Sequence, residues 1–418
     1  MKFILELAAK NLLRYKRRTI ITSIAIAMGL MMYIFVDSLL MGANLESMRN
    51  LKWYETASLR VHKESYWEER MFLPLESSIE NPEAVLDLLA KEGITATERT
   101  VFAADMILYQ EDFGEDGNMT VQVTAINPET DFSVYRFKDT LLEGRFLKKG
   151  EMDGVVLGSW FAEDIGAKVG YWVTFVTRGQ GGFYEAFDMQ IVGIVNCPNP
   201  NVNRTLVMMD KDAADLYLAM EGAVTSIDIL LPEKSDLASV SKMLQADLSV
   251  IDPQLRVFTW EDLARDYLAL LEAKQGGTGL ILFLVFIIAA VGVSNTMLMA
   301  MFERMREIGM MRALGMKDRD ILFSFLFEAG GIGLVGSLVG ILLGVLANLY
   351  LVNVGFDFGF VFRDMDIGFR IQNVMRGAWS IATIAKAFFS GIGLSMLVAI
   401  FPIRRALKLD IPTCLHHQ

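Results

Sequence analysis

Long apolar stretches alternate with polar segments along the chain, and this pattern predicts a membrane protein. Four stretches are long enough to cross a hydrocarbon core of about 30 Å as helices, because each helical residue adds about 1.5 Å. They occupy residues 19–41, 279–302, 321–354 and 382–402. We therefore expect a membrane α-helical protein with four transmembrane helices and a large polar block, residues 42–278, between the first and the second.

The polar block mixes strand-like and helix-like patterns. Alternating apolar and polar residues predict strands at 57–62, 120–126, 172–177, 189–195 and 226–231. Helical patterns follow Ser235 and Asn81-Pro82, where Asn81 is an N-cap and Pro82 the first helical residue. Because helix-and-strand portions flank a strand-rich portion, we expect an α+β domain. A split α/β subdomain, about 42–100 and 226–270, would be interrupted by a β-rich insertion, about 101–225.

Charge predicts the orientation of the chain in the membrane. Residues 1–18 (an amphipathic helix leading into the first span), 303–320 (a connector between the second and third spans) and 403–418 (a tail) hold more basic than acidic residues. The whole chain has a formal net charge of −11. By the positive-inside rule, both termini and the connector are cytoplasmic, and the acidic block and the loop 355–381 are extracytoplasmic.

The first apolar stretch also has the basic flank of a signal peptide. Its apolar run is longer than the ~7–15 residues of a signal-peptide core, and no A-x-A-like site follows Met41, so we expect it to remain as an anchor. The two cysteines, Cys197 and Cys414, fall on opposite sides of the predicted membrane and cannot pair within one chain.

Catalytic and metal chemistry lack candidate residues in this sequence. The histidines are His62, His416 and His417, and the last two are adjacent in the tail, so a catalytic triad or a zinc-hydrolase site would have to be assembled around His62 alone. No G-x-x-x-x-G-K-[ST] motif occurs, so a nucleotide that drives this protein would bind another subunit. We therefore expect a chain that is not an enzyme and binds no metal or cofactor.

The connector has the pattern of a short amphipathic helix. Its charged residues are interleaved with Ile308, Met311 and Leu314 at helical spacing. Such a helix is suited to docking on another protein.

Two features of the third span need an explanation. Gly336, Gly340 and Gly344 repeat at intervals of four, which lets a second helix approach closely. The partner is either the second or fourth span of the same chain or a second copy. Glu328 lies about two turns from the cytoplasmic end of the span, where it either ties the span to basic residues near the connector or relays protons. Asp37 and Lys386 lie near external helix ends, where they can pair or reach water.

The connector sequence ERMREIGMMRALG at 303–315, followed by Glu328-Ala329 and the glycine-rich helix, resembles the C-terminal core of FtsX-like permeases. These are membrane subunits of MacB/LolCDE-type ABC transporters. The resemblance extends to residues 7–18, to 401–406 and, within the polar block, to 155–158 and 192–194, so that it covers nearly the full chain.

The resemblance implies a role for the connector. It would be a coupling helix that contacts a cytoplasmic ABC ATPase dimer, which binds ATP and Mg. The residues implied at or beside the ATPase are Arg304, Glu307, Ile308, Arg312, Leu314 and Gly315. Two permeases, identical or paralogous, would sit in the inner membrane and work by mechanotransmission: ATP-driven closure of the ATPases reshapes the external domains.

Three functions remain open. The first is lipoprotein release of the LolC or LolE type, with lipoprotein cargo and a periplasmic carrier, which suits an adaptable surface of Met28, Met31 and Met32 on the first span. Ordinary lipid contact explains these methionines equally well. The second is MacB-like efflux of peptides or drugs with a periplasmic adaptor, and the third is FtsX-like activation of cell-wall hydrolases.

Overall fold

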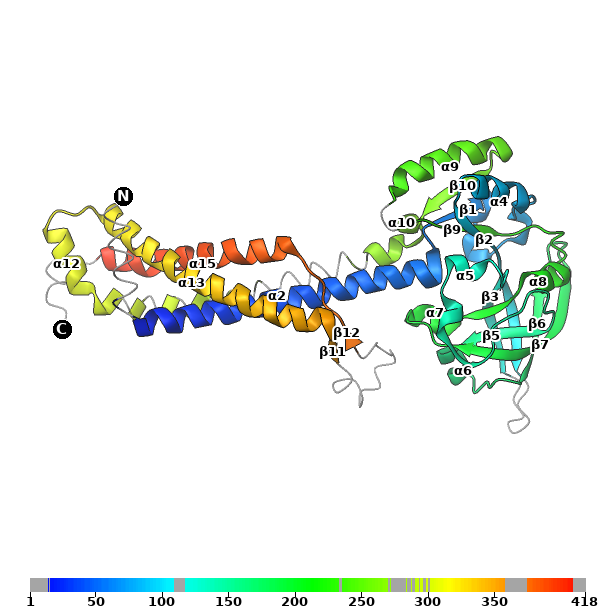
Figure 1. Ribbon diagram of the computed structural model, residues 1–418, viewed down its shortest axis with the longest axis horizontal. Helices are drawn as coiled ribbons and strands as arrows, with labels where there is room; N and C mark the ends of the chain where they lie inside the picture. The colour runs from blue at the N-terminus through cyan, green and yellow to red at the C-terminus, as the bar shows by residue number, and fades with distance from the viewer. Residues whose placement is uncertain are drawn as a thin grey trace. The chain divides into compact units, whose positions relative to one another are not determined.

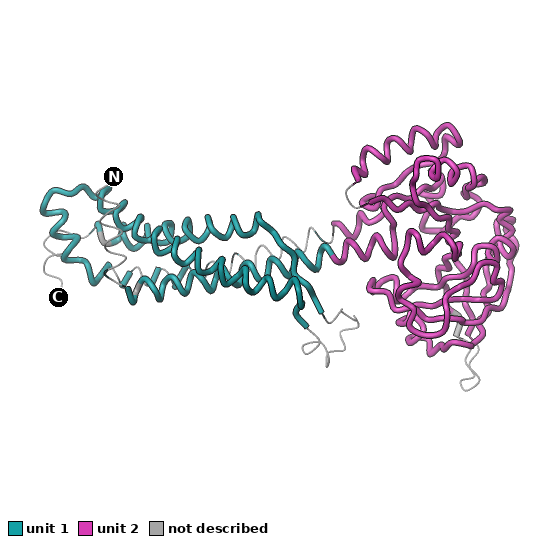
Figure 2. The backbone as a smooth tube through the Cα atoms, in the orientation of Figure 1, with its two compact units in different colours: residues 1–45, 270–365, 373–418 teal, residues 46–269, 366–372 magenta. Residues whose placement is uncertain are grey.

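The computed structural model describes residues 14, 16–108, 117–232, 235–269, 271, 301–357 and 374–408, with separate positions between 283 and 299. The chain forms two compact units, coloured separately in Figure 2. The first comprises Met1–Leu45, Leu270–Met365 and Asn373–Gln418, and the second comprises Glu46–Ala269 and Asp366–Gln372.

The first unit is helical. Its described elements are α2 Lys16–Leu51, α12 Met305–Ala313, α13 Asp318–Asn353, α15 Ile381–Leu407 and the two-stranded ladder of β11 Phe356–Asp357 and β12 Val374–Met375 (Figure 1). Among the described residues, three helices are long and apolar enough to span a membrane: Thr19–Thr56, Asp318–Asn353 and Ile381–Arg405. The expected second span, 279–302, lies largely outside the described residues.

The first helix continues beyond the apolar run that ends at residue 41. It is α-helical through Leu51 and passes into a π-helical turn, η1 Lys52–Thr56. The 36 residues of α2 extend about 54 Å at about 1.5 Å per residue, well beyond a hydrocarbon core of about 30 Å. The end of the apolar run therefore marks the edge of the expected hydrocarbon layer, and polar residues such as Asn44 and Glu46 carry the helix further.

The glycines of α13 pack against α2, which corrects the expectation that they face the second or fourth span. A Cβ added at each glycine would come within 3 Å of α2: Gly336 at 2.9 Å from Ile26, Gly340 at 2.9 Å from the Ala27 backbone and Gly344 at 2.8 Å from Ile34. The α15 helix uses other glycines of α13, since Gly330 and Gly333 face Met396 and Ser395. Spacing thus predicts a close-packed face but does not identify the helix that covers it.

The second unit contains one large sheet with a four-stranded antiparallel portion. The order of this portion is β10 Leu255–Thr259, β1 Leu59–Lys63, β9 Ser226–Leu230 and β2 Thr95–Leu108. Helices α4 Pro82–Lys91 and α9 Leu237–Ile251 bury Val85, Leu89 and Leu244 against Leu59 and Ile227 of its strands. The Asn81 side chain accepts a hydrogen bond from Ala84 N at 3.3 Å, which confirms the predicted N-cap.

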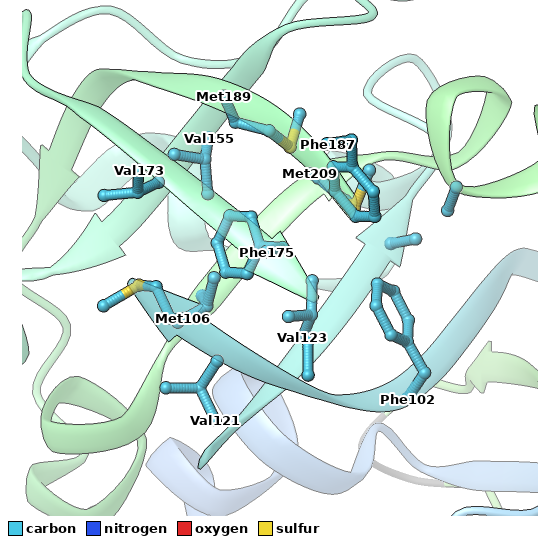
Figure 3. Close-up of a cluster of buried hydrophobic side chains, with 14 of the residues drawn as sticks. Phe102, Met106, Val121, Val123, Val155, Val173, Phe175, Phe187, Met189 and Met209 are labelled. Atoms are coloured by element: carbon cyan, nitrogen blue, oxygen red, sulfur yellow. The ribbon is translucent and has the colours of Figure 1, made fainter. Parts of the chain in front are cut away.

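The remaining strands form a closed ring with β2. Its members in order are β2, β3 Gly117–Ile126, β8 Val207–Asp210, β5 Gly154–Gly158, β7 Tyr184–Val195 and β6 Trp172–Arg178, which pairs with β7 and again with β2. Fully buried Phe102, Met106, Phe175 and Met189 belong to its core (Figure 3). Strand β4 Leu141–Gly144 pairs with β7 outside the ring. The long strand β2 is therefore common to the open sheet and the barrel.

Short helices connect these strands. They are α3 Glu64–Glu68, η2 Arg70–Phe72, η3 Leu75–Ser77, α5 Asp131–Val134, η4 Phe137–Thr140, α6 Ser159–Asp164, α7 Pro200–Thr205, α8 Lys211–Leu218 and α10 Trp260–Leu263.

At the sheet edge, Gln245 of α9 donates to Leu255 O and accepts from Val257 N, both at 2.9 Å. The side chain of Gln245 thus occupies backbone groups of β10 that a further strand would otherwise use.

Candidate functional site

The connector folds as a helix followed by a tight turn. Helix α12 begins after Arg304 and ends at Ala313, and Leu314 N donates to Met310 O at 3.0 Å. Gly315 adopts a φ of +87°, a left-handed conformation that favours glycine at a helix end. Helix α13 then starts at Asp318.

Arg304 lies inside the first unit, against α13. Its Nη1 donates to Glu328 Oε2 at 2.8 Å and its Nε donates to Glu307 Oε2 at 2.9 Å. The Arg304 and Glu328 side chains are 5% and 2% exposed, and the guanidinium lies 5.2 Å from the Phe325 ring centroid. Glu307 Oε1 also lies 3.8 Å from Arg14 Nη1. The Arg304–Glu328 pair joins the start of the connector to α13.

The exposed face of the connector differs from the set of residues expected beside an ATPase. Ile308 is fully buried and Arg304 nearly so, whereas Leu314 is 88% exposed and Gly315 is exposed. Glu307 is partly buried, and Arg312 Nε lies 3.2 Å from Asp318 Oδ1. The expected residues thus divide between an inner and an outer face.

Three further residues of the connector are exposed, although the sequence did not predict them beside the ATPase. Arg306, Met310 and Ala313 are exposed, and Met310 is 49% exposed. These three residues are spaced i, i+4 and i+7, so they share one face of the helix, and Leu314 continues that face. Met305 and Ile308 lie on the opposite face. We define Arg306, Met310, Ala313, Leu314 and Gly315 as the outer face of the connector. The phase of the amphipathic pattern would have found these positions.

Polar residues at the other end of the first unit also pair across helices. Asp37 Oδ2 accepts from Thr383 Oγ1 at 2.6 Å, which joins α2 to α15. The Ser38 hydroxyl of α2 is hydrogen-bonded to Asn348 of α13. Ser38 Oγ also donates to Ala378 O at 2.9 Å. Polar groups in membrane helices are costly unless they find partners, and these contacts provide partners within the chain.

Buried titratable groups of the second unit have shifted pKa values. Burial raises the pKa of the Cys197 thiol to about 12, which keeps it protonated and unreactive at neutral pH. Burial, aided by the neighbouring Arg60, lowers the pKa of His62 to about 4. No group of three or more potential metal ligands occurs in the described part of the chain, while Cys414, His416 and His417 lie outside it.

Two protein-family models match the chain. Residues 19–247 match the MacB-like periplasmic core domain, and residues 279–411 match the family described as FtsX-like permease C-terminal. The chain belongs to the ABC transporter permeases of the MacB/LolC/FtsX type.

Curated relatives extend over most of the chain. An uncharacterized ABC transporter permease of Methanocaldococcus jannaschii is 25% identical over 361 residues, covering 82% of this chain and 83% of the relative. The lipoprotein-releasing system transmembrane protein LolC of Neisseria meningitidis serogroup B is 24% identical, covering 71% of this chain and 73% of LolC. The macrolide export ATP-binding/permease protein MacB of Pasteurella multocida is 22% identical, and the match covers 96% of this chain and 58% of MacB.

A solved structure resembles part of the chain. The periplasmic region of MacB from Actinobacillus actinomycetemcomitans matches with 13% identity and a TM-score of 0.37, covering 53% of this chain and 97% of that structure.

Proposed function

We propose that this permease releases lipoproteins from the outer leaflet of an inner membrane by mechanotransmission. The observation that carries the coupling part of the proposal is the Arg304–Glu328 ion pair, because it ties the connector to α13 inside a buried cluster. The cargo part is supported by the similarity to LolC, which covers 73% of that relative. The permease would work as a pair of identical or paralogous subunits with both termini cytoplasmic.

In this proposal a separate ATPase dimer binds ATP and Mg and docks on the outer face of the connector. Leu314 and Met310 supply apolar contact there, and Arg306 supplies charge. Movement of the connector passes through Arg304 and Glu328 to α13. The glycine face of α13 is packed on α2, so α13 and α2 move together. Helix α2 carries the movement onward, because its last residues belong to the second unit.

Cargo would be held at apolar helix surfaces instead of passing through a polar channel. On α2, Ile24, Met28 and Met32 are 53%, 51% and 47% exposed and recur every four residues. Methionine is unbranched and flexible, so a surface that contains it adapts to acyl chains of different length. This stripe is the proposed contact for the lipid part of a lipoprotein.

Two measurements test the proposal. For coupling, Leu314→Asp in the full complex should abolish ATPase binding while the permease keeps its melting temperature; Val250→Asp, at an 85% exposed position of the second unit, is the matched control. For cargo, proteoliposomes with permease and ATPase should release a lipidated protein to a soluble carrier when ATP is added. ATP hydrolysis without release of the lipidated protein would refute the lipoprotein assignment.

The second candidate is export of the MacB type, because the MacB relative matches 96% of this chain. It predicts ATP-dependent movement of peptides or macrolides in the presence of a periplasmic adaptor. The same proteoliposomes, supplied with an adaptor and a labelled macrolide, distinguish the two activities.

A further inference from the structure

A pocket of about 540 Å³ lies in the second unit beside the shared strand β2. Strands β1, β2, β3 and β9 line it together with η1 and α7, so both the open sheet and the barrel contribute to its wall. It is separate from the connector, and nothing in the proposed transport function assigns a role to it.

The guanidinium groups of two arginines line this pocket, one half-buried and one buried. They belong to Arg60 of β1 and Arg99 of β2, whose side chains are 20% and 6% exposed. Arg60 Nε is hydrogen-bonded to Asp228, and Arg99 Nε donates to Asp131 Oδ1 at 2.7 Å. The Arg99 guanidinium carbon lies 3.4 Å from the centroid of the Tyr135 ring, which fixes the plane of the group. The two arginines are therefore held in place before any ligand arrives.

The hydrogen-bonding capacity of these arginines is not used up. Arg60 Nη2 donates to Glu55 O at 2.7 Å and Tyr135 Oη at 3.0 Å. Arg99 Nη2 lies 2.7 Å from Asp131 Oδ1, an ion-pair distance, but has no hydrogen-bond partner among the described residues. Within the described part of the chain, neither Arg60 nor Arg99 uses its Nη1 atom in a hydrogen bond. Arginine has five N–H donors, so the Nη1 groups of both arginines are left for an acceptor that a ligand brings.

We propose that the pocket binds the carboxylate of a small organic acid or of a peptide C-terminus. A carboxylate is planar and offers two acceptor oxygens, which match the fork of a guanidinium group. Apolar side chains of the lining, among them Phe161, Val202 and Leu206, accept the apolar body of the ligand.

Charge favours a carboxylate over a phosphate. The arginines that line the pocket are Arg60, Arg99 and Arg204, and the acids that line it or pair with these arginines include Glu55, Asp131 and Asp228. Acids thus already compensate part of the positive charge of these arginines, so a ligand that brings fewer negative charges is favoured. A singly charged carboxylate therefore disturbs the pocket less than a doubly charged phosphate.

Calorimetric titration of the full chain in lipid nanodiscs tests this proposal. The probes are N-acetylphenylalanine and its amide, and the peptide acetyl-Ala-Ala-Ala-Ala-Phe with a free or an amidated C-terminus. We expect at least one acid to bind at least tenfold more tightly than its amide. The acid that binds identifies the source of the carboxylate, and equal binding of each acid and its amide overturns the proposal.

Variants locate the site. Arg99→Lys keeps the charge but loses the planar fork, so binding of the acid should weaken at least tenfold. Thr205→Trp, at an exposed position of the lining, should block binding without lowering the melting temperature, and Val250→Trp is its matched control. Unchanged affinity in Thr205→Trp overturns the location even if Arg99→Lys fails to fold.

Discussion

Arg304 Nη1 and Glu328 Oε2 lie 2.8 Å apart, and both side chains are almost completely buried. A residue at the start of the connector and one in α13 thus form a buried charge pair, and Arg304 also keeps its hydrogen bond to Glu307. Buried pairs of this kind are costly to break but often cheap to replace as a unit, because the loss of one partner leaves the other charge unpaired.

We expect Glu328→Leu alone to destabilise the protein by about 3 kcal/mol, because Arg304 loses a buried partner. The double variant Arg304→Met/Glu328→Leu should recover most of this loss. Thermal denaturation of the purified permease measures both, and Glu303→Gln, at an exposed position of the connector, is the control. A double variant less stable than Glu328→Leu would show that the pair itself stabilises the fold.

We expect Gly340→Ala to destabilise the packing of α13 on α2. The new Cβ would lie 2.9 Å from the Ala27 backbone, which cannot rotate away as a side chain can. Overpacking of this kind costs about 1–3 kcal/mol. Gly393→Ala on α15 is the matched control, since nothing lies within 4 Å of its added Cβ. Denaturation midpoints compare the two, and equal midpoints would contradict close packing at Gly340.

The pH dependence of stability should contain a contribution from His62. Its Nδ1 donates to Thr225 O at 2.7 Å in a buried environment, and its pKa falls from 6.5 to about 4 on folding. Because the folded pKa is the lower one, the unfolded chain binds the proton first. Stability present above pH 6.5 is therefore lost as the pH falls towards 4, by about 3 kcal/mol at about 1.4 kcal/mol per unit.

His62→Gln removes this titration. The free energy of unfolding, measured in urea at several pH values from 4 to 7, should therefore fall less steeply for the variant than for the original protein. Parallel curves would mean that His62 does not titrate over this range.

Gln245→Ala should expose the edge of β10. The variant loses two hydrogen bonds to backbone groups of Leu255 and Val257, worth about 1 kcal/mol each. It also leaves these groups available to a strand from another molecule. We expect concentration-dependent association in light scattering, whereas Lys242→Ala, at an exposed position of the same helix, should remain unchanged.

Local patterns predicted local structure well in this chain. The strand expected at 120–126 lies within β3, and the helix after Asn81 begins at Pro82. The first signal is the alternation of apolar and polar residues along a strand, and the second is an N-cap followed by proline. Each acts over a few residues. The membrane-protein class and the family follow from patterns of the same kind.

Pairings between distant residues were harder to predict. The second contact of β6, with β2, closes the barrel but leaves no mark in the sequence of either strand. The glycine face of α13 was visible, but its partner α2 was not. The resemblance implies that Arg304 lies at or beside the ATPase, whereas its side chain is buried against α13, because a family motif gives positions and not the direction in which a side chain points.

The order of strands in the open sheet has a consequence for how the protein is made. Leu59 of β1 pairs with Ile229 of β9 and with Thr259 of β10, and both partners are synthesised long after it. The barrel strands emerge from the ribosome in between, so the barrel can close around β2 while β1 still waits for both neighbours. During that interval the apolar face of β1 is uncovered. The open sheet can therefore be completed only after the strand ending at Thr259 has been made.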